Sequence, residues 1–366
     1  MLVVAKYGTS SLTDAGGSID HGSIAKACAE LAGLREAGHR VIVVSSGAIA
    51  AGLPPLGWEG ERPSDLPTLQ AVAAVGQHRL LRTWDDHLSP LGLVAGQVLL
   101  APLDFVHRQQ YLHARQTLMR LLELGVVPVV NENDAIADDE IRFGDNDRLA
   151  ALVAHLVGAG VLVLLTDTAG VHTADPRLDA GASLIQEIVE VDESLQRAAG
   201  GAGSQRGSGG MASKLAAAKI AAWSGVRVVI AAAERPGVLG DAVAGEPAVG
   251  TVVRARQTRL PARKLWIAFA VGASGRIVVD DGARQALVER GRSLLPAGVV
   301  GVSGSFVADD AVEIATADGS VFAKGLVRHS AATVADWAGR QTVDLPADVA
   351  PEVVHRDDMV VLPSVP

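Results

Sequence analysis

Short apolar segments alternate with helix-like segments along the first two thirds of the chain, and this alternation constrains the fold more than any other feature. Buried strands are predicted at 2–6, 41–46, 93–100, 126–131, 161–167 and 226–233. Most intervening segments have the apolar spacing of a helix, as in Ile24, Ala27, Cys28, Leu31 and Leu34. Parallel strands need such crossovers, so the alternation predicts a mostly parallel sheet with helices on both faces.

The composition agrees with a globular protein and excludes several other classes. The 366 residues suffice for two or three domains, and 49% of them are hydrophobic. The net charge of −9 does not favour general binding to nucleic acids. Cys28 is the only cysteine, so no intrachain disulfide can form, and the apolar runs are shorter than the ~20 residues of a membrane helix. We therefore expect a cytoplasmic protein without a signal peptide or membrane association.

The pattern changes after residue 253, which predicts a second domain. Residues 254–266 are basic, contain Pro261 and lack periodicity, as is typical of a linker. Beyond them, short strand-like runs surround one short helical segment at 282–291. The sequence thus predicts a first domain at 1–255, a linker at 256–273 and a small, mostly β domain at 274–366.

Small and polar residues follow four of the predicted strands. The segments are "KYGTSS" from Lys6, "SSGAIAAG" from Ser45, "NEND" from Asn131 and "TDTAG" from Thr166. The carboxyl ends of parallel strands meet at one edge of the sheet, where such folds bind their ligands. Connecting loops are often polar in any case, so the clustering predicts a site without identifying its ligand.

Glycines and two lysines in these segments favour a phosphate ligand. Residues 200–214, "GGAGSQRGSGGMASK", form a glycine-rich stretch that leads into a helix carrying Lys214. Backbone amides of such a loop can hold an anion, and Lys6 and Ser46 can add a charge and a hydroxyl group. The alternatives are a flexible linker, a surface lysine and a helix cap at Ser46. Together with the carboxylates of "NEND" and "GDND", the lysines indicate phosphoryl transfer, which requires positioning and charge neutralisation.

Longer motifs carry a resemblance to one enzyme family. Six segments of the chain resemble, in their order along the chain, the motifs of the glutamate 5-kinases, which belong to the amino acid kinase family. These segments are "VAKYGTSSLT", "VVSSGAIAAG", "AAVGQ", "NENDAIADDEIRFGDNDRLAALVA", "LLTDTAGVHTADPR" and "GSGGMASKLAAAKIA". The distal segments "ARKLWI", "AKGLV" and "VHRDDMVVL" resemble the PUA domain of many bacterial glutamate 5-kinases. The resemblance implies a three-layer α/β sandwich with a mostly parallel central sheet, followed by a small, mostly β PUA-like domain.

The resemblance also implies an activity. Members of the family transfer the γ-phosphoryl group of ATP to the side-chain carboxylate of L-glutamate, in the first step of proline synthesis. They are typically inhibited by proline, pass their product to a glutamyl phosphate reductase, and form dimers or tetramers. We therefore expect a homo-oligomeric enzyme that uses ATP and Mg²⁺. No dedicated metal site is expected, because Mg²⁺ would bind through the ATP phosphates and water.

The resemblance further implies roles for individual residues. Lys6 and Lys214 match the lysines that contact the transferring phosphoryl group, and Asp147 matches the aspartate that orients both. Glutamate binding is implied for Ser46, Gly47, Asp134 and Asn146. ATP binding is implied for Lys6, Gly8, Thr9, Thr166, Asp167, Ser208, Gly209, Gly210, Met211, Ala212, Ser213 and Lys214. The chemistry agrees, because an ammonium group pairs with a carboxylate and a carboxylate accepts from hydroxyl and amide donors.

Other functions remain open at this stage. PUA domains elsewhere bind RNA, but the arginines of the second domain are offset by aspartates, so the sequence does not favour RNA binding. Another kinase of the same fold could act on a different carboxylate or phosphate acceptor. Metal binding by "ADDE" at 137–140 or "HRDD" at 355–358 is not favoured, because solvated loops explain these runs.

Overall fold

An eight-stranded sheet and a five-stranded sheet form the centres of two separate units in the computed structural model. The units are Met1–Arg259 and Leu260–Pro366. The structure describes residues 1–14, 16–58, 62–105, 107–136, 146–176, 178–179, 181–192, 195–196, 199, 210–257, 259–269, 272–346 and 349–362. Within these ranges, no helix combines the length and the apolar character that a membrane crossing requires.

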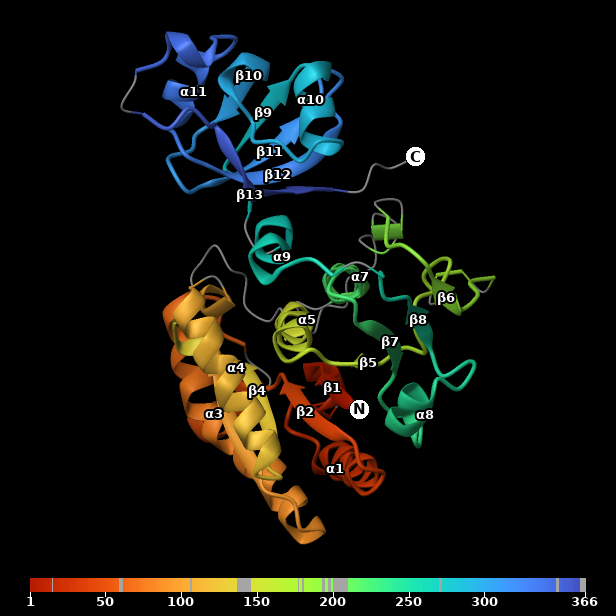
Figure 1. The fold of residues 1–366 in the computed structure, drawn as a ribbon. Helices are drawn as coiled ribbons and strands as arrows, with labels where there is room; N and C mark the ends of the chain where they lie inside the picture. The colour runs from red at the N-terminus through yellow and green to blue at the C-terminus, as the bar shows by residue number, and fades with distance from the viewer. Residues whose placement is uncertain are drawn as a thin grey trace. The chain divides into compact units, whose positions relative to one another are not determined.

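The first unit follows the predicted alternation of strands and helices (Figure 1). Its strands are β1 (Leu2–Tyr7), β2 (Arg40–Ser45), β3 (Ala95–Leu100), β4 (Val127–Glu132), β5 (Val161–Thr166), β6 (Glu187–Ile188), β7 (Arg227–Ala232) and β8 (Thr251–Val253). Its helices include α1 (His21–Glu36), α2 (Ala48–Gly52), α3 (Leu66–Leu88), α4 (Arg108–Glu123), α5 (Asn146–Val157), α7 (Met211–Trp223) and α8 (Val238–Ala244).

The strand order of the first sheet brings four strand ends together. The order is β3-β4-β2-β1-β5-β7-β8-β6. Neighbouring strands from β3 to β7 are parallel, and only the β7–β8 pair is antiparallel. The carboxyl ends of β4, β2, β1 and β5 therefore lie side by side at one edge of the sheet. The prediction of a mostly parallel sheet is confirmed.

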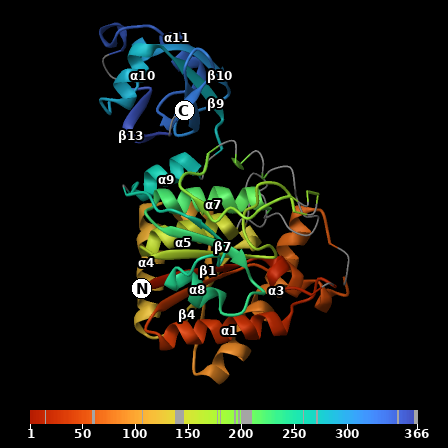
Figure 2. The same ribbon diagram turned by 90° about the vertical axis from the view of Figure 1, so that its right-hand side faces the viewer.

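Alternation within β1 directs its side chains to two different helical layers. Val3, Ala5 and Tyr7 lie in an apolar core that includes residues of α1, α3 and α8. Successive side chains of a strand point to opposite faces, so Val4 and Lys6 point to the other face. Helices α5 and α7 cover that face, on the side opposite α1 (Figures 1 and 2). The strand pattern thus turns Lys6 toward the layer formed by these two helices.

The second unit is small and mostly β, as predicted. Its strands are β9 (Gly275–Val279), β10 (Val299–Gly304), β11 (Ala311–Ala315), β12 (Val321–Val327) and β13 (Val354–Val361), and their order is β10-β9-β11-β12-β13. Its helices are α9 (Ala262–Phe269), α10 (Asp281–Val288) and α11 (Ala331–Trp337). The sequence predicts only one of these helices, at α10, whereas α9 falls within the predicted linker and α11 was not singled out.

The segment predicted to be an aperiodic linker, 256–273, contains helix α9, so that prediction is wrong for this stretch. Leu265 and Ile267 are fully buried, and α9 packs against β13. Arg263 also forms an ion pair with Asp358 of β13, with 2.7 Å between Nη2 and Oδ1. Contacts with the second sheet therefore stabilise this helix.

Two glycines let helix α3 pass directly against α2. A Cβ atom added at Gly76 would overlap the carbonyl oxygen of Ala48 and the backbone nitrogen of Gly52. A Cβ atom added at Gly52 would overlap the carbonyl oxygen of Val72. Only glycine permits such a close approach of two backbones. Because α2 starts at the end of β2, this contact fixes α3 beside the carboxyl edge of the sheet.

We expect Gly76→Ala to lower the free energy of unfolding by about 2–3 kcal/mol, because the added methyl group forces α2 and α3 apart. Denaturant unfolding measures the change. The matched control is Gly33→Ala in α1, where a Cβ atom meets open space. This control should be neutral or stabilising by up to about 1 kcal/mol. Equal losses in both variants would contradict the close packing of the two helices.

Candidate functional site

Two lysines and one aspartate meet at the carboxyl edge of the first sheet. Lys6 Nζ lies 2.5 Å from Asp147 Oδ1, and Lys214 Nζ lies 3.3 Å from Asp147 Oδ2. Lys6 is in β1, Asp147 is in the first turn of α5, and Lys214 is in the first turn of α7. The residues are only 3%, 1% and 5% exposed, respectively. Buried charges are costly without partners, so the three groups stabilise one another only as a set.

The aspartate of this cluster stays ionised. Burial by itself raises the pKa of Asp147, but the charges of Lys6 and Lys214, with hydrogen bonds from Lys6 and Ser213, outweigh it and lower the pKa to about 2. Two ammonium groups and one carboxylate leave a net positive charge. The N-termini of α5 and α7 add positive potential at the same place. The cluster therefore suits an anionic group such as a phosphoryl group.

A second polar cluster, formed by Ser46 and Asn146, lies next to the first because Asn146 directly precedes Asp147 in the chain. Asn146 Nδ2 donates to Ser46 Oγ over 3.0 Å. Asn146 Oδ1 accepts from the backbone N–H of Glu132, at the end of β4, over 3.3 Å. Because Ser46 Oγ accepts the first bond, its own proton can be donated to a carboxylate. Adjacent residues of α5 thus join a donor cluster to the cationic cluster.

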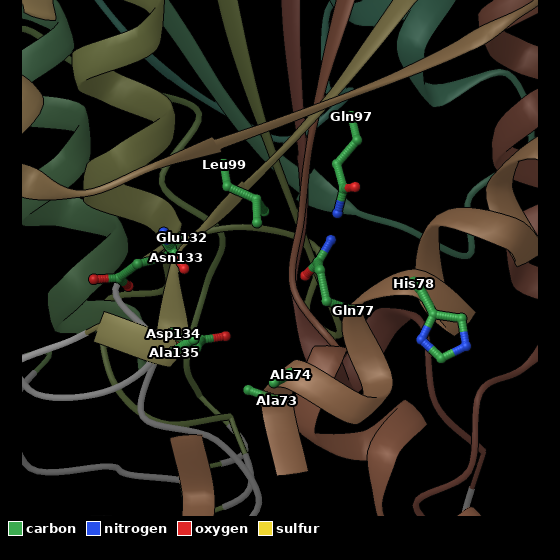
Figure 3. Close-up of a pocket in the computed structure, with 10 residues that line it drawn as sticks. All are labelled: Ala73, Ala74, Gln77, His78, Gln97, Leu99, Glu132, Asn133, Asp134 and Ala135. Atoms are coloured by element: carbon green, nitrogen blue, oxygen red, sulfur yellow. The ribbon is translucent and has the colours of Figure 1, made fainter. Parts of the chain in front are cut away.

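A cavity of about 310 Å³ opens between α3 and the carboxyl ends of β3 and β4 (Figure 3). It is lined by Ala73, Ala74, Gln77, His78, Gln97, Leu99, Glu132, Asn133, Asp134 and Ala135. The amide groups of Gln77 and Gln97 face each other across it in Figure 3, and Gln77 Oε1 accepts from Asn131 Nδ2 over 2.7 Å. Its size suits a small organic molecule, and the carboxyl groups of Glu132 and Asp134 favour one that carries an ammonium group.

Asp134 is an ionisable group of the cavity with a shifted pKa. It begins a short 3₁₀ turn, Asp134–Ile136, directly beyond β4, and it is 9% exposed. Burial raises the pKa of Asp134 to about 6, and the positive charge of Arg62 offsets part of this rise. An ammonium group bound beside Asp134 would favour its ionised form. A cationic ligand beside Asp134 would therefore stabilise its ionised carboxylate.

Several other residues that the sequence predicts for the site lie at the same edge of the sheet. Thr166 ends β5, and its hydroxyl group donates to Asp167 Oδ1 over 3.0 Å. Gly8 follows β1, where a Cβ atom would lie 3.4 Å from Lys6 Nζ. Gly47 precedes α2 with φ at 109°, in the left-handed region that favours glycine. The positive φ at Gly47 would strain any residue with a Cβ atom, so glycine is required there.

The predicted nucleotide loop is only partly described. Thr9 lies in the 3₁₀ turn Thr9–Ser11 that follows β1. Gly210 caps the N-terminus of α7, and Met211 and Ala212 follow in the first turn, where they are half-buried. The predicted residues Ser208 and Gly209 lie outside the described residues.

Sequence reasoning did not single out Gln77, His78 or Gln97 as cavity residues. Gln77 falls within the motif "AAVGQ", which carries part of the family resemblance. Nothing in that motif indicates that the Gln77 amide contacts Asn131. Gln97 lies on the edge strand β3, where strand alternation alone does not distinguish a cavity from solvent. The contact from Ser213 to Asp147, over 2.6 Å, was also not predicted.

Comparisons with known proteins show the family to which the chain belongs. Residues 1–232 match the amino acid kinase family, and residues 275–348 match the PUA domain. Glutamate 5-kinases of Pelobacter propionicus and Herpetosiphon aurantiacus are 44% and 46% identical to the chain over 364 residues. Each alignment covers 98% of this chain, and they cover 97% and 98% of the respective relatives. The chain belongs to the glutamate 5-kinases of the amino acid kinase family.

A solved structure agrees on the fold of this glutamate 5-kinase family member. Carbamate kinase from Giardia lamblia, bound to AMP-PNP, aligns with a TM-score of 0.51 and 18% identity. The alignment covers 70% of this chain and 98% of that chain. At this identity the similarity supports the fold alone. The resemblance to glutamate 5-kinases and the PUA domain, predicted from the motifs, is confirmed by the family matches.

The raised pKa of Asp134 predicts a pH-dependent change in stability. A carboxyl group whose folded pKa of about 6 exceeds its usual 3.8 destabilises the fold when it is ionised, above pH 6, and the penalty disappears as the pH falls toward 4. We therefore expect Asp134→Asn to raise the free energy of unfolding at pH 8 by about 1–3 kcal/mol and to have little effect at pH 4. Denaturant unfolding across this pH range measures both values.

The matched control for this measurement is Asp86→Asn on the exposed part of α3. The Asp86 side chain is 61% exposed, so the change should stay within about 0.5 kcal/mol at either pH. A loss of stability in Asp134→Asn at pH 8 would show that the ionised carboxylate is well solvated or paired, against the account given above.

Proposed function

We propose that the chain transfers the γ-phosphoryl group of ATP to the side-chain carboxylate of L-glutamate. Its family membership supports this activity. The observation that carries the proposal is the direct connection, through Asn146 and Asp147, between a buried cationic cluster and a cluster of carboxylate donors. One cluster suits a phosphoryl group and the other suits a carboxylate, so two anions that repel each other can meet between them.

The proposed reaction needs charge neutralisation more than proton transfer. The side-chain carboxyl group of glutamate is ionised at pH 7, since its reference pKa is about 4.3. One carboxylate oxygen forms a bond to the γ-phosphorus as the bond between phosphorus and the β–γ bridging oxygen breaks. The products are L-glutamyl 5-phosphate and ADP. Lys6 and Lys214 would offset the charge of the migrating group, and Asp147 would hold their ammonium groups in place.

We assign substrate binding to two groups of residues. Asp134 would pair with the ammonium group of glutamate, while Ser46, Gly47 and Asn146 would donate hydrogen bonds to its carboxylates. The position of Asp134 in the cavity and the free donor capacity of Ser46 support this division. ATP would be held by Gly8, Thr9, Thr166 and Asp167, which follow or end strands, and by the stretch 208–214, whose described part, 210–214, lies at the N-terminus of α7.

Mg²⁺ enters this proposal as part of the nucleotide substrate. The carboxylate at the centre, Asp147, is already engaged by two ammonium groups and a hydroxyl group. Among the described residues, no three His, Cys, Asp or Glu side chains gather to form a metal site. The ion would bind to the ATP phosphates and keep its own waters. The ion would neutralise part of the phosphate charge.

We also propose the regulation and partners that accompany this activity in related enzymes. Proline would act as a feedback inhibitor, and the chain would assemble into a homodimer or homotetramer. The product is a labile acyl phosphate, which supports transfer to a glutamyl phosphate reductase before hydrolysis. Binding of RNA by the second unit is not proposed, because its surface carries arginines that pair with carboxylates, as in Arg276–Glu313 and Arg328–Glu352.

Replacing either central lysine should nearly abolish turnover. We expect Lys6→Met and Lys214→Met each to reduce kcat by at least about 100-fold, because the charge of the migrating group loses a partner. The matched control is Lys219→Met on the same helix, whose Nζ lies 6.0 Å from the Trp223 ring centroid. It should keep near-normal activity. ADP release measures the rates, and rates close to normal in the central variants would refute the assignment.

An acceptor panel tests the substrate directly. With glutamate, aspartate, acetylglutamate and UMP as acceptors, only glutamate should give ADP release and an acyl phosphate that hydroxylamine traps. Asp134→Asn should raise the KM for glutamate about 10- to 100-fold and leave the KM for ATP nearly unchanged, because a charged hydrogen-bond partner of the ammonium group is lost. A preference for another acceptor, or a selective rise in the KM for ATP, would contradict this function or this role.

A further inference from the structure

Ser213 makes the shorter of two contacts to one oxygen of the central aspartate. Its Oγ donates to Asp147 Oδ2 over 2.6 Å, whereas Lys214 Nζ lies 3.3 Å from the same oxygen. Lys6 contacts the other oxygen, Oδ1, at 2.5 Å. The carboxylate is therefore held at one oxygen by a lysine of β1 and at the other by two neighbouring residues of α7.

This arrangement fixes the plane of the carboxylate. A carboxylate held at only one oxygen can rotate about its Cβ–Cγ bond, because that torsion has a broad energy profile. The ion pair at Oδ1 and the hydrogen bonds at Oδ2 restrict this freedom. Without the hydroxyl group of Ser213, Oδ2 would keep only the longer contact to Lys214 among those described above. The carboxylate would then be held less firmly, and with it the positions of the two ammonium groups relative to each other.

We propose that Ser213 is a positioning residue for catalysis, which acts through Asp147 by fixing the carboxylate that holds Lys6 and Lys214. This inference rests on the proposed function and, for Ser213 alone, replaces the nucleotide contact that the resemblance implies and that was assigned above to the stretch 208–214. The hydroxyl group points to a carboxylate in the structure, and its short contact is charge-assisted. The same hydrogen bond also helps to keep the pKa of Asp147 low.

The steady-state kinetics of Ser213→Ala separate the possible roles. We expect kcat to fall about 10- to 100-fold, the range expected for loss of a hydrogen bond to a charged group, while the KM values for ATP and glutamate change less than about threefold. Ser213→Thr keeps a hydroxyl group and should restore most of kcat. A nucleotide contact would instead raise the KM for ATP with kcat largely preserved, and that result would overturn the proposal.

Ser224→Ala is the matched control for the loss of a hydroxyl group from this region. Ser224 directly follows α7, and its Oγ donates to the carbonyl oxygen of Ile220 over 2.8 Å, away from Asp147. Its kcat should match that of the unchanged protein. If Ser224→Ala lowered kcat as much as Ser213→Ala, the effect would reflect general damage to the helix, and the proposal would fail.

A double-mutant cycle with Asp147→Asn tests whether Ser213 acts through Asp147. The effect of Ser213→Ala on kcat should largely disappear in the Asp147→Asn background, because the carboxylate that it positions is already gone. An equal effect in both backgrounds would overturn the proposal. The cycle is measured with whichever acceptor the unchanged protein phosphorylates. If that acceptor is not glutamate, the proposed function fails, but the cycle still tests the role of Ser213.

A stability measurement gives a second readout that does not depend on activity. The pKa of Asp147 is lowered in the fold, so its ionised form contributes stability at neutral pH, and this contribution is lost as the pH falls through about 4 toward 2. Ser213→Ala should therefore destabilise the protein more at pH 7 than at pH 3. In the Asp147→Asn background this pH dependence should vanish. A pH-independent loss in both backgrounds would show that Ser213 acts without Asp147.

Discussion

The shared carboxylate of Asp147 is the interaction on which the rest of the site depends. It allows Lys6 and Lys214 to remain buried and close together, although like charges in a poorly solvated place repel each other. The fold brings the three groups together from a strand and two helices that are distant in sequence. Each helix begins at the carboxyl edge of the parallel sheet, so both N-termini add their positive potential to the same volume.

The first turn of α5 connects the two halves of the chemistry. Asn146 engages Ser46, whereas the next residue, Asp147, engages the lysines. Successive side chains of a helix point in directions about 100° apart, so one turn can serve the acceptor and the migrating group at the same time. The cavity beside β4 completes this arrangement with Asp134, whose ionisation costs stability until a cation arrives. The ionised Asp134 therefore destabilises the fold without a ligand, and the same carboxylate can bind a cationic ligand.

The sequence predicted the parallel sheet well because buried strands such as β1, β2 and β5 have continuous apolar runs with helical segments between them. It also placed the central lysines at strand and helix ends, although their roles came from resemblance. It failed at α9, whose buried Leu265 and Ile267 depend on contacts with a distant strand. The sequence also did not predict the contact between Ser213 and Asp147 or the facing amide groups of Gln77 and Gln97. Such contacts depend on side-chain rotamers and on how the helices are placed, and local sequence patterns encode neither.

The glycine contact between α2 and α3 limits how this enzyme can diverge. The stretch of α3 that lines the cavity, from Ala73 to His78, includes Gly76, whose backbone meets α2 without any side chain between them. Because the two backbones touch at Gly76, α2 and α3 cannot move closer together, and there is no side chain at this position that could be made smaller. Room for a longer or shorter acceptor therefore has to come from exchanging side chains on the cavity wall, because α2 and α3 are already in backbone contact.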